Sequence, residues 1–149
     1  MPDSRVHIRR AQRTDFTAVM TLLGTSGAAV PPPDRATLRR FRNLVADLGT
    51  DFYLALVDGT LAGLIHVTYA RQLSALPQAQ LAQLLVDPAL RRRGIGSALL
   101  AFIRQRARKR GCRTFCCAVG THDSAARAFL EQAGLRLVGE WFREDVQSS

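Results

Sequence analysis

The residues with the clearest chemical potential lie between Val86 and Leu100, where the sequence reads VDPALRRRGIGSALL. Three arginines lead into Gly94-Ile95-Gly96, and an apolar pattern with helical spacing begins immediately afterwards. The first turn of a helix presents backbone N–H groups without a helical partner and carries about half a positive charge. Glycine lets a phosphate oxygen approach the backbone because it has no Cβ, and arginine adds forked donors. The segment therefore predicts a pyrophosphate site.

Two common phosphate-binding loops do not match this segment. A P-loop requires a lysine after its last glycine, and this segment has none. The dinucleotide-binding fingerprint requires a third small residue, where this chain has Leu99. It also requires an acidic residue about 20 positions later, where this chain has Arg113 or Phe115. Both interpretations are therefore disfavoured.

The elements that must position the segment follow from the spacing of apolar residues and from turn signals. After the glycines, apolar residues recur at helical spacing from Ile95 until Gly111 ends the helix. Asp58-Gly59 between two apolar runs predicts a hairpin. We expect helices over residues 16–23, 35–48, 95–110 and 124–133. We expect strands over residues 7–11, 51–57, 60–70, 79–86, 113–119 and 135–142.

The resulting order, β-α-α-β-β-β-α-β-α-β, predicts an α/β protein of the α+β type. The 149 residues fit a single domain spanning 1–149, and 47% of them are hydrophobic, enough for a buried core. No repeat or second domain is evident.

The formal net charge of +9 raises the possibility of a nucleic-acid partner. Eight of the 21 basic residues lie between Arg91 and Arg110, where they would form a phosphate-tracking stripe. The aromatic residues, however, fit the periodic core rather than a surface platform, and no RNA- or DNA-binding signature is present. We therefore expect no nucleic acid as partner.

No apolar run approaches the roughly 18 residues of a membrane span, and the N-terminus lacks the apolar region of a secretory signal. A cytoplasmic protein without a membrane contact is the expectation. Cys112, Cys116 and Cys117 are an odd number of cysteines in an apolar setting, which predicts buried thiols rather than a disulfide or a metal site.

The six residues RRRGIG that begin at Arg91 resemble the acetyl-CoA-binding signature [QR]-x-x-G-x-[GA] of the GNAT superfamily of N-acetyltransferases. Downstream, DSAARAFLEQAGL, from Asp123 to Leu135, is similar to the family pattern N-x-x-A-x-x-[FL]-Y-E-x-x-G-[FL]. The likeness extends over nearly the whole chain, including the opening IRRAQRTDFTAVMTLL. It implies a GNAT fold of bacterial-like type, with a mixed, mostly antiparallel sheet of six or seven strands and about four helices.

The resemblance implies that acetyl-CoA is the cofactor and that no metal takes part. The strand ending at Val86 would pair with the pantetheine arm, the turn from Arg92 to Ser97 would hold the pyrophosphate, and Arg91 or a neighbouring arginine would reach the 3′-phosphate. Asp123 stands where the family usually has an asparagine. The full set of implied cofactor-binding residues is Leu84, Leu85, Val86, Arg91, Arg92, Arg93, Gly94, Ile95, Gly96, Ser97, Asp123 and Phe129.

The catalytic residues stay open, because this chain departs from the family at two positions. Gln80 stands where members often have a glutamate base, and Leu130 stands where many have a tyrosine acid. His66, Tyr69 and His122 are the candidates that remain. Alternation along a strand puts His66 and Tyr69 on opposite faces, so only one of them can face the cleft.

The function that follows is an N-acetyltransferase that moves an acetyl group from acetyl-CoA to a primary amine of a small molecule or peptide, by direct attack in a ternary complex. Two alternatives remain: a catalytically idle acyl-CoA-binding sensor or partner domain, and a basic nucleic-acid-binding module.

The acceptor and the oligomeric state are less constrained by the sequence. The segments expected to wall the amine site carry four arginines, which favours an acceptor with a carboxylate or phosphate beside its amine. These are Arg35, Arg39, Arg40 and Arg71. A homodimer is possible through the final strand from Leu135, which carries Trp141 and Phe142.

Overall fold

A computed structural model describes residues 5–27 and 29–147, and its centre is a sheet with the strand order β1-β2-β3-β4-β5. The first four strands pair antiparallel, and β5 pairs parallel to β4. The strands are β1 (Val6–Arg10), β2 (Asp51–Val57), β3 (Thr60–Gln72), β4 (Ala75–Val86) and β5 (Thr114–Cys117). The helices are α1 (Phe16–Gly24), α2 (Arg35–Ala46), α3 (Ile95–Lys109) and α4 (Ser124–Gln132). Short 3₁₀ helices lie at Arg13–Asp15 and Pro88–Leu90.

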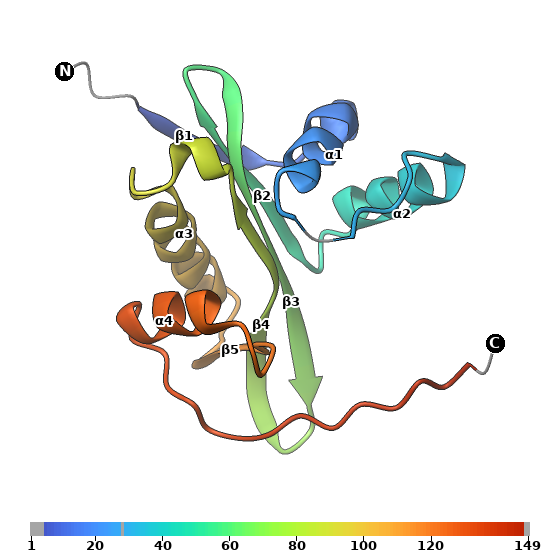
Figure 1. Ribbon diagram of the computed structural model, residues 1–149. Coiled ribbons are helices and arrows are strands. Elements are labelled where there is room, and N and C mark those ends of the chain that lie inside the picture. The colour runs from blue at the N-terminus through green and yellow to red at the C-terminus, as the bar shows by residue number, and fades with distance from the viewer. Residues whose placement is uncertain (1–4, 28, 148–149) are drawn as a thin grey trace.

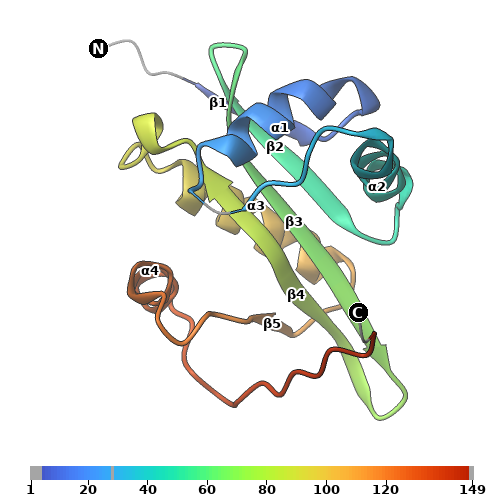
Figure 2. The same ribbon diagram turned by 45° about the vertical axis from the view of Figure 1, so that its right-hand side comes forward.

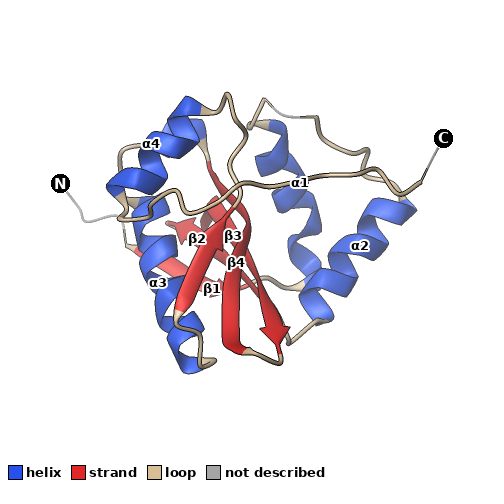
Figure 3. Ribbon diagram, turned by 90° about the horizontal axis from the view of Figure 1, so that it is seen from below, coloured by secondary structure: helices blue, strands red, loops and turns tan. Residues whose placement is uncertain are grey.

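The helices form a layer on each side of the sheet, with α1 and α2 on one face and α3 and α4 on the other (Figures 1 and 3). Because successive side chains of β3 point to opposite faces of the sheet, this strand contributes apolar residues to the core on each face. Ile65 and Val67 are fully buried in the cluster that contains the apolar residues of α3, whereas Leu64 packs in the cluster with Phe41 and Phe52. The expected α+β class and the order of the elements up to α4 are confirmed.

The predicted strand over residues 135–142 is wrong, so the sheet has five described strands rather than six or seven. After α4 the chain runs beneath the sheet as an extended segment without regular structure (Figure 1). A strand needs a hydrogen-bonding neighbour, and none of the described strands pairs with this segment. Its large apolar side chains are accordingly exposed: Leu137 by 77%, Trp141 by 74% and Phe142 by 93%.

Two other boundaries differ from expectation. β3 and β4 extend into the segment 71–78, which had been expected to be a loop, and form a long hairpin there. Cross-strand pairing stabilises that segment despite its weak local strand signal. β5 has four residues and is shorter than expected, because β4 and β5 pair only from Gln78 to Leu81.

A buried ion cluster ties the sheet to α3. Asp51, the first residue of β2, is completely buried, and it accepts hydrogen bonds from Arg110 Nη2 at 2.9 Å, from Arg106 Nη2 at 3.1 Å and from the Tyr69 hydroxyl. Arg10 Nη1 of β1 lies 3.8 Å from the same carboxylate. Burial by itself raises the pKa of Asp51, but the bonds from Arg110, Tyr69 and Arg106 outweigh it and hold that pKa below its usual value.

We expect Asp51→Asn to lower the free energy of unfolding by about 3 kcal/mol, because it leaves the arginines around it without their counter-charge. Urea denaturation at pH 7 measures this. Asp58→Asn is the matched control, since Asp58 is exposed in a turn at φ 51°, a conformation that Asn tolerates.

The same cluster predicts the pH dependence of stability. A depressed folded-state pKa stabilises the protein above the unfolded value of about 3.9 and stops doing so as the pH falls through the folded value. The stability difference between wild type and Asp51→Asn should therefore shrink below pH 4. Equal loss in both asparagine variants, or a pH-independent difference, would contradict this account.

Candidate functional site

The site begins where two neighbouring strands separate. β4 pairs with β5 only from Gln78 to Leu81, and β4 then continues for five more residues. Ala82 is an extra residue in the pairing of β4 with β3, a β-bulge at the point of separation. Figure 2 shows β5 leading away to α4 while β4 continues toward the turn before α3. Beyond Leu81, this edge of β4 has no strand partner among the described residues.

The separation leaves main-chain groups of β4 unpaired. Asp87 N donates to Ala62 O on β3 at 2.8 Å. Hydrogen bonds alternate along an antiparallel ladder, so the N–H and C=O groups of Val86 and Leu84 point to the opposite, open side. An extended ligand with amide groups can pair with this edge as an added strand would.

The turn after β4 is shaped to present the first turn of α3. The Asp87 side chain accepts a hydrogen bond from Ala89 N at 3.0 Å, which fixes the start of the turn. Arg92 and Gly94 both have left-handed backbone angles, with φ of 69° and 74°, and Gly94 is the N-cap of α3. The N–H groups of the first helical turn have no acceptor within the helix, so an anion fits there.

The side chains around this turn separate into an exposed and a buried set. Arg91, Arg92, Arg93 and Ser97 are exposed, whereas Ile95 is buried at 1% exposure and anchors the turn in the core. The turn therefore combines mobile positive charge with a fixed backbone.

Phe129 of α4 lies beside Gly96 in the first turn of α3. A Cβ at residue 96 would lie 3.4 Å from the ring of Phe129 and 3.6 Å from Val86 Cγ2, at ordinary contact distance. Asp123 caps its own helix, accepting from Ala126 N at 3.0 Å, so its carboxylate is already engaged.

The two candidates on β3 lie on opposite faces of the sheet, as alternation predicted. Tyr69 faces α3 and donates to Asp51, and burial together with Asp51 raises the pKa of its hydroxyl. Tyr69 is therefore part of the buried ion cluster and not of the cleft. His66 packs against Phe52 on the other face, with ring centroids 5.4 Å apart.

His66 has an unusual environment for a polar side chain. It is only 9% exposed, and its Nε2 atom is buried without a hydrogen-bond partner among the described residues. Burial lowers the pKa of His66 below its usual value, so the ring is neutral with a lone pair available. The third candidate, His122, is exposed in the loop before α4.

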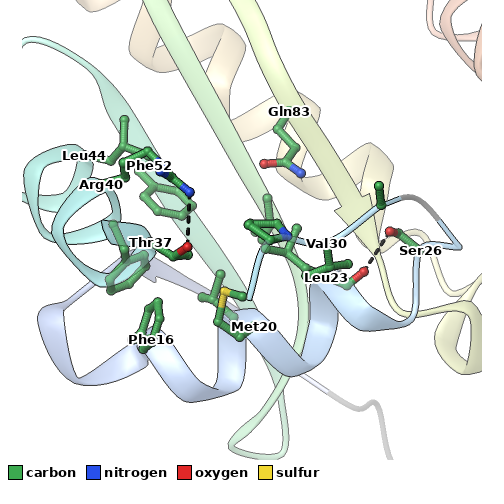
Figure 4. Close-up of a pocket in the computed structure, with 15 residues that line it drawn as sticks. Phe16, Met20, Leu23, Ser26, Val30, Thr37, Arg40, Leu44, Phe52 and Gln83 are labelled. Atoms are coloured by element: carbon green, nitrogen blue, oxygen red, sulfur yellow. Dashed lines mark hydrogen bonds between the residues drawn. The ribbon is translucent and has the colours of Figure 1, made fainter. Parts of the chain in front are cut away.

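A cavity of about 310 Å³ adjoins β4 on the α1 and α2 face (Figure 4). His66 lies between two of its lining residues, since it pairs with Phe52 of β2 on one side and Gln83 of β4 on the other. The cavity is lined by Phe16, Val19, Met20, Leu23, Ser26, Ala29, Val30, Pro31, Thr37, Arg40, Phe41, Leu44, Phe52, Leu64 and Gln83.

Most of these lining residues escaped sequence analysis. The apolar residues of α1 and α2 have the spacing of core residues, and spacing cannot separate a core from a cavity wall. Gln83 lies next to the bulge at Ala82, and no sequence signal predicts that bulge. All four arginines expected at an amine site are exposed; Arg40 lines the cavity, and Arg35, Arg39 and Arg71 do not.

The structure also gives the surroundings of Leu130, Gln80 and the three cysteines. Leu130 is buried at 8% exposure. Gln80 of β4 lies opposite Cys116 of β5, in the four-residue paired region. Cys112 is buried, and the three cysteines are free thiols.

The described residues contain no group of three or more His, Cys, Asp or Glu side chains placed to hold a metal ion. None of their helices has the length and apolar character needed to cross a membrane.

Comparison with known proteins gives a family match over most of the chain. Residues 11–135 match the family described as acetyltransferase (GNAT) family. A search of curated proteins finds no match.

Solved structures share the fold at low sequence identity. A transcriptional regulator from Bacillus halodurans C-125 is 23% identical, with 95% of this chain and 99% of that chain covered and a TM-score of 0.85. A putative acetyltransferase from Agrobacterium tumefaciens is 21% identical, with 93% and 99% covered and a TM-score of 0.81. The aminoglycoside N-acetyltransferase AAC(6')-Iy, in complex with CoA, is 18% identical, with 99% of each chain covered and a TM-score of 0.84.

Proposed function

The chain belongs to the acetyltransferase (GNAT) family, and on that premise we propose that it moves the acetyl group of acetyl-CoA to a primary amine by direct attack in a ternary complex. The observation that carries the proposal is the open edge of β4 running directly into the glycine turn of α3. The edge of β4 would pair with the amides of the pantetheine arm, and the glycine turn would bind the pyrophosphate. These two groups follow one another in the same order along coenzyme A.

The residues present fit this cosubstrate. Main-chain groups of Leu84 and Val86 bind the pantetheine amides, and the N–H groups from Ile95 to Ser97 bind the pyrophosphate. The exposed arginines 91–93 add charge at the phosphates. The bound thioester supplies an already activated acetyl carbonyl.

Catalysis then depends on orientation and on main-chain donors. The cleft holds the amine against the carbonyl carbon, and such alignment lowers a barrier by roughly 7–11 kcal/mol. A free main-chain N–H of the open β4 edge would donate to the carbonyl oxygen, where negative charge develops, and a donor of this kind contributes about 3–4 kcal/mol.

His66 is the residue we propose as proton acceptor from the attacking amine. Three observations support it: a buried Nε2 without a hydrogen-bond partner among the described residues, a pKa lowered by burial, and a position between two residues that line the cavity. Gln80 cannot accept a proton, and buried Leu130 has no proton to donate to the departing thiolate. The thiolate then takes its proton from solvent.

An acyl-CoA-binding sensor is the second candidate, and the apolar Leu130 at the position of the family's usual acid favours it. Incubation with acetyl-CoA and a panel of amines separates the two functions, with thiol release followed by a chromogenic disulfide. Turnover on any amine supports the enzyme, whereas CoA binding without turnover supports the sensor.

We expect Gly94→Glu to weaken CoA binding at least tenfold, about 1.4 kcal/mol, because a carboxylate at the first turn of α3 repels the pyrophosphate. Titration calorimetry measures the affinity. Gly111→Glu is the matched control, since Gly111 follows the other end of α3, has a φ of 81° and has equally open space around it. Equal affinities for the two variants would place the pyrophosphate elsewhere.

We expect His66→Gln to lower kcat about 100-fold, the usual loss when a general base is removed. Tyr69→Phe serves as control on the same strand and should keep kcat, because Tyr69 faces α3. In wild type, protonation of His66 should cut kcat with an apparent pKa below 6.5, since burial lowers the pKa of this ring. An unchanged acid limb in His66→Gln would show that another group accepts the proton.

We also propose that two copies pair through residues 135–142, whose exposed Trp141 and Phe142 need a cover. Light scattering should give a dimer for wild type and a monomer for Trp141→Ser/Phe142→Ser. Leu73→Ser is the control, because Leu73 is a fully exposed apolar residue at the far hairpin of β3 and β4. A monomeric wild type would refute the pairing.

A further inference from the structure

The cavity beside β4 differs in character from the strongly basic surface of the protein. Its walls are mainly apolar, with three phenylalanine rings in sequence: Phe16 lies 5.5 Å from Phe41, and Phe41 lies 5.9 Å from Phe52, centroid to centroid. Val30 and Leu44 remain 37% and 38% exposed at its margin. Apolar side chains kept accessible around a cavity indicate an apolar ligand.

The polar side chains of the cavity lie in three places: Gln83 on β4, Arg40 with Thr37 on α2, and Ser26, whose hydroxyl donates to Leu23 O at 2.7 Å (Figure 4). Gln83 projects from β4, next to His66 in the pairing with β3. Arg40 and Thr37 project from α2, and Arg40 Nη2 donates to Thr37 Oγ1 at 3.1 Å. That bond engages one of the five N–H groups of the guanidinium, so donors remain for a ligand carboxylate.

The charge at the lining is of one sign. Among the described residues that line the cavity, Arg40 is the one charged side chain, and there is no Asp or Glu. The carboxylate nearest to Arg40 in sequence, Asp34, does not line the cavity and caps α2 by accepting from Thr37 N at 2.9 Å. A polyamine or aminoglycoside would therefore bring several positive charges to a wall with no counter-charge, where they would be repelled.

We propose that the acceptor is a monoamine with an apolar, ring-sized body and a carboxylate at its far end, bound with the amine at Gln83 and the carboxylate at Arg40. The inference rests on the proposed acetyl transfer and adds the substrate class. A volume of about 310 Å³ lies near the lower limit of ligand pockets, which suits a single ring with short substituents.

Three probe amines test the substrate class: 4-(2-aminoethyl)benzoate, 2-phenylethylamine, which lacks the carboxylate, and the polycation spermidine. Thiol release from acetyl-CoA gives kcat/KM for each. We expect the benzoate to exceed phenylethylamine by about tenfold, the usual worth of a charge-assisted hydrogen bond. We expect spermidine to be the poorest of the three.

The Arg40→Gln variant tests the position of the carboxylate. It should raise KM for the benzoate about tenfold with little change in kcat, and leave phenylethylamine unaffected. Arg39→Gln is the matched control, because Arg39 is the preceding, exposed arginine of α2 and does not line the cavity. It should preserve the preference for the benzoate.

The outcomes separate the two levels of the proposal. A preference for spermidine, or an unchanged preference for the benzoate in Arg40→Gln, overturns the substrate class and leaves acetyl transfer standing. CoA binding without turnover of any probe also overturns the substrate class and favours the sensor. Absence of CoA binding overturns the proposed function itself.

Discussion

The site depends on the early end of pairing between β4 and β5. Backbone N–H and C=O groups in a sheet are normally satisfied by a neighbouring strand. Here the parallel pairing stops after four residues, and the bulge at Ala82 marks the point of separation. The open edge of β4 therefore retains hydrogen-bonding capacity that an extended ligand can use. The short β5 is thus part of the site and not a defect of the sheet.

Geometry links this edge to the helix that follows. The strand ends at Val86, the Asp87 side chain fixes the start of the turn, and Arg92 and Gly94 lead into α3 with left-handed backbone angles. Buried Ile95 holds this turn against the core, and Phe129 of α4 lies beside Gly96. The fold therefore fixes the main-chain groups of the turn, whereas its arginines are exposed side chains.

Because side chains alternate along β3, the two faces of the sheet carry different polar groups. On the α3 face, Tyr69 joins Asp51 and its arginines in a buried network that connects β1, β2, β3 and α3. On the other face, His66 lies between two residues that line an apolar cavity, and its Nε2 is buried without a hydrogen-bond partner in the part of the chain that the structure describes. An unsatisfied buried nitrogen costs stability, and such a cost is typical of a functional site. Residues three apart on one strand thereby have unrelated roles, one in stability and one in the proposed chemistry.

The sequence alone determined the elements from β1 to α4, the glycine turn before α3 and the opposite faces of His66 and Tyr69, because these follow from local spacing, turn residues and strand alternation. Only the tertiary structure decided which main-chain groups are free, since the separation of β4 from β5 and the bulge at Ala82 are properties of pairing. It also decided that apolar residues of α1 and α2 line a cavity and that Asp51 is buried among arginines. For residues 135–142, an apolar strand pattern was present and a pairing partner was not, and a strand forms only where both are available.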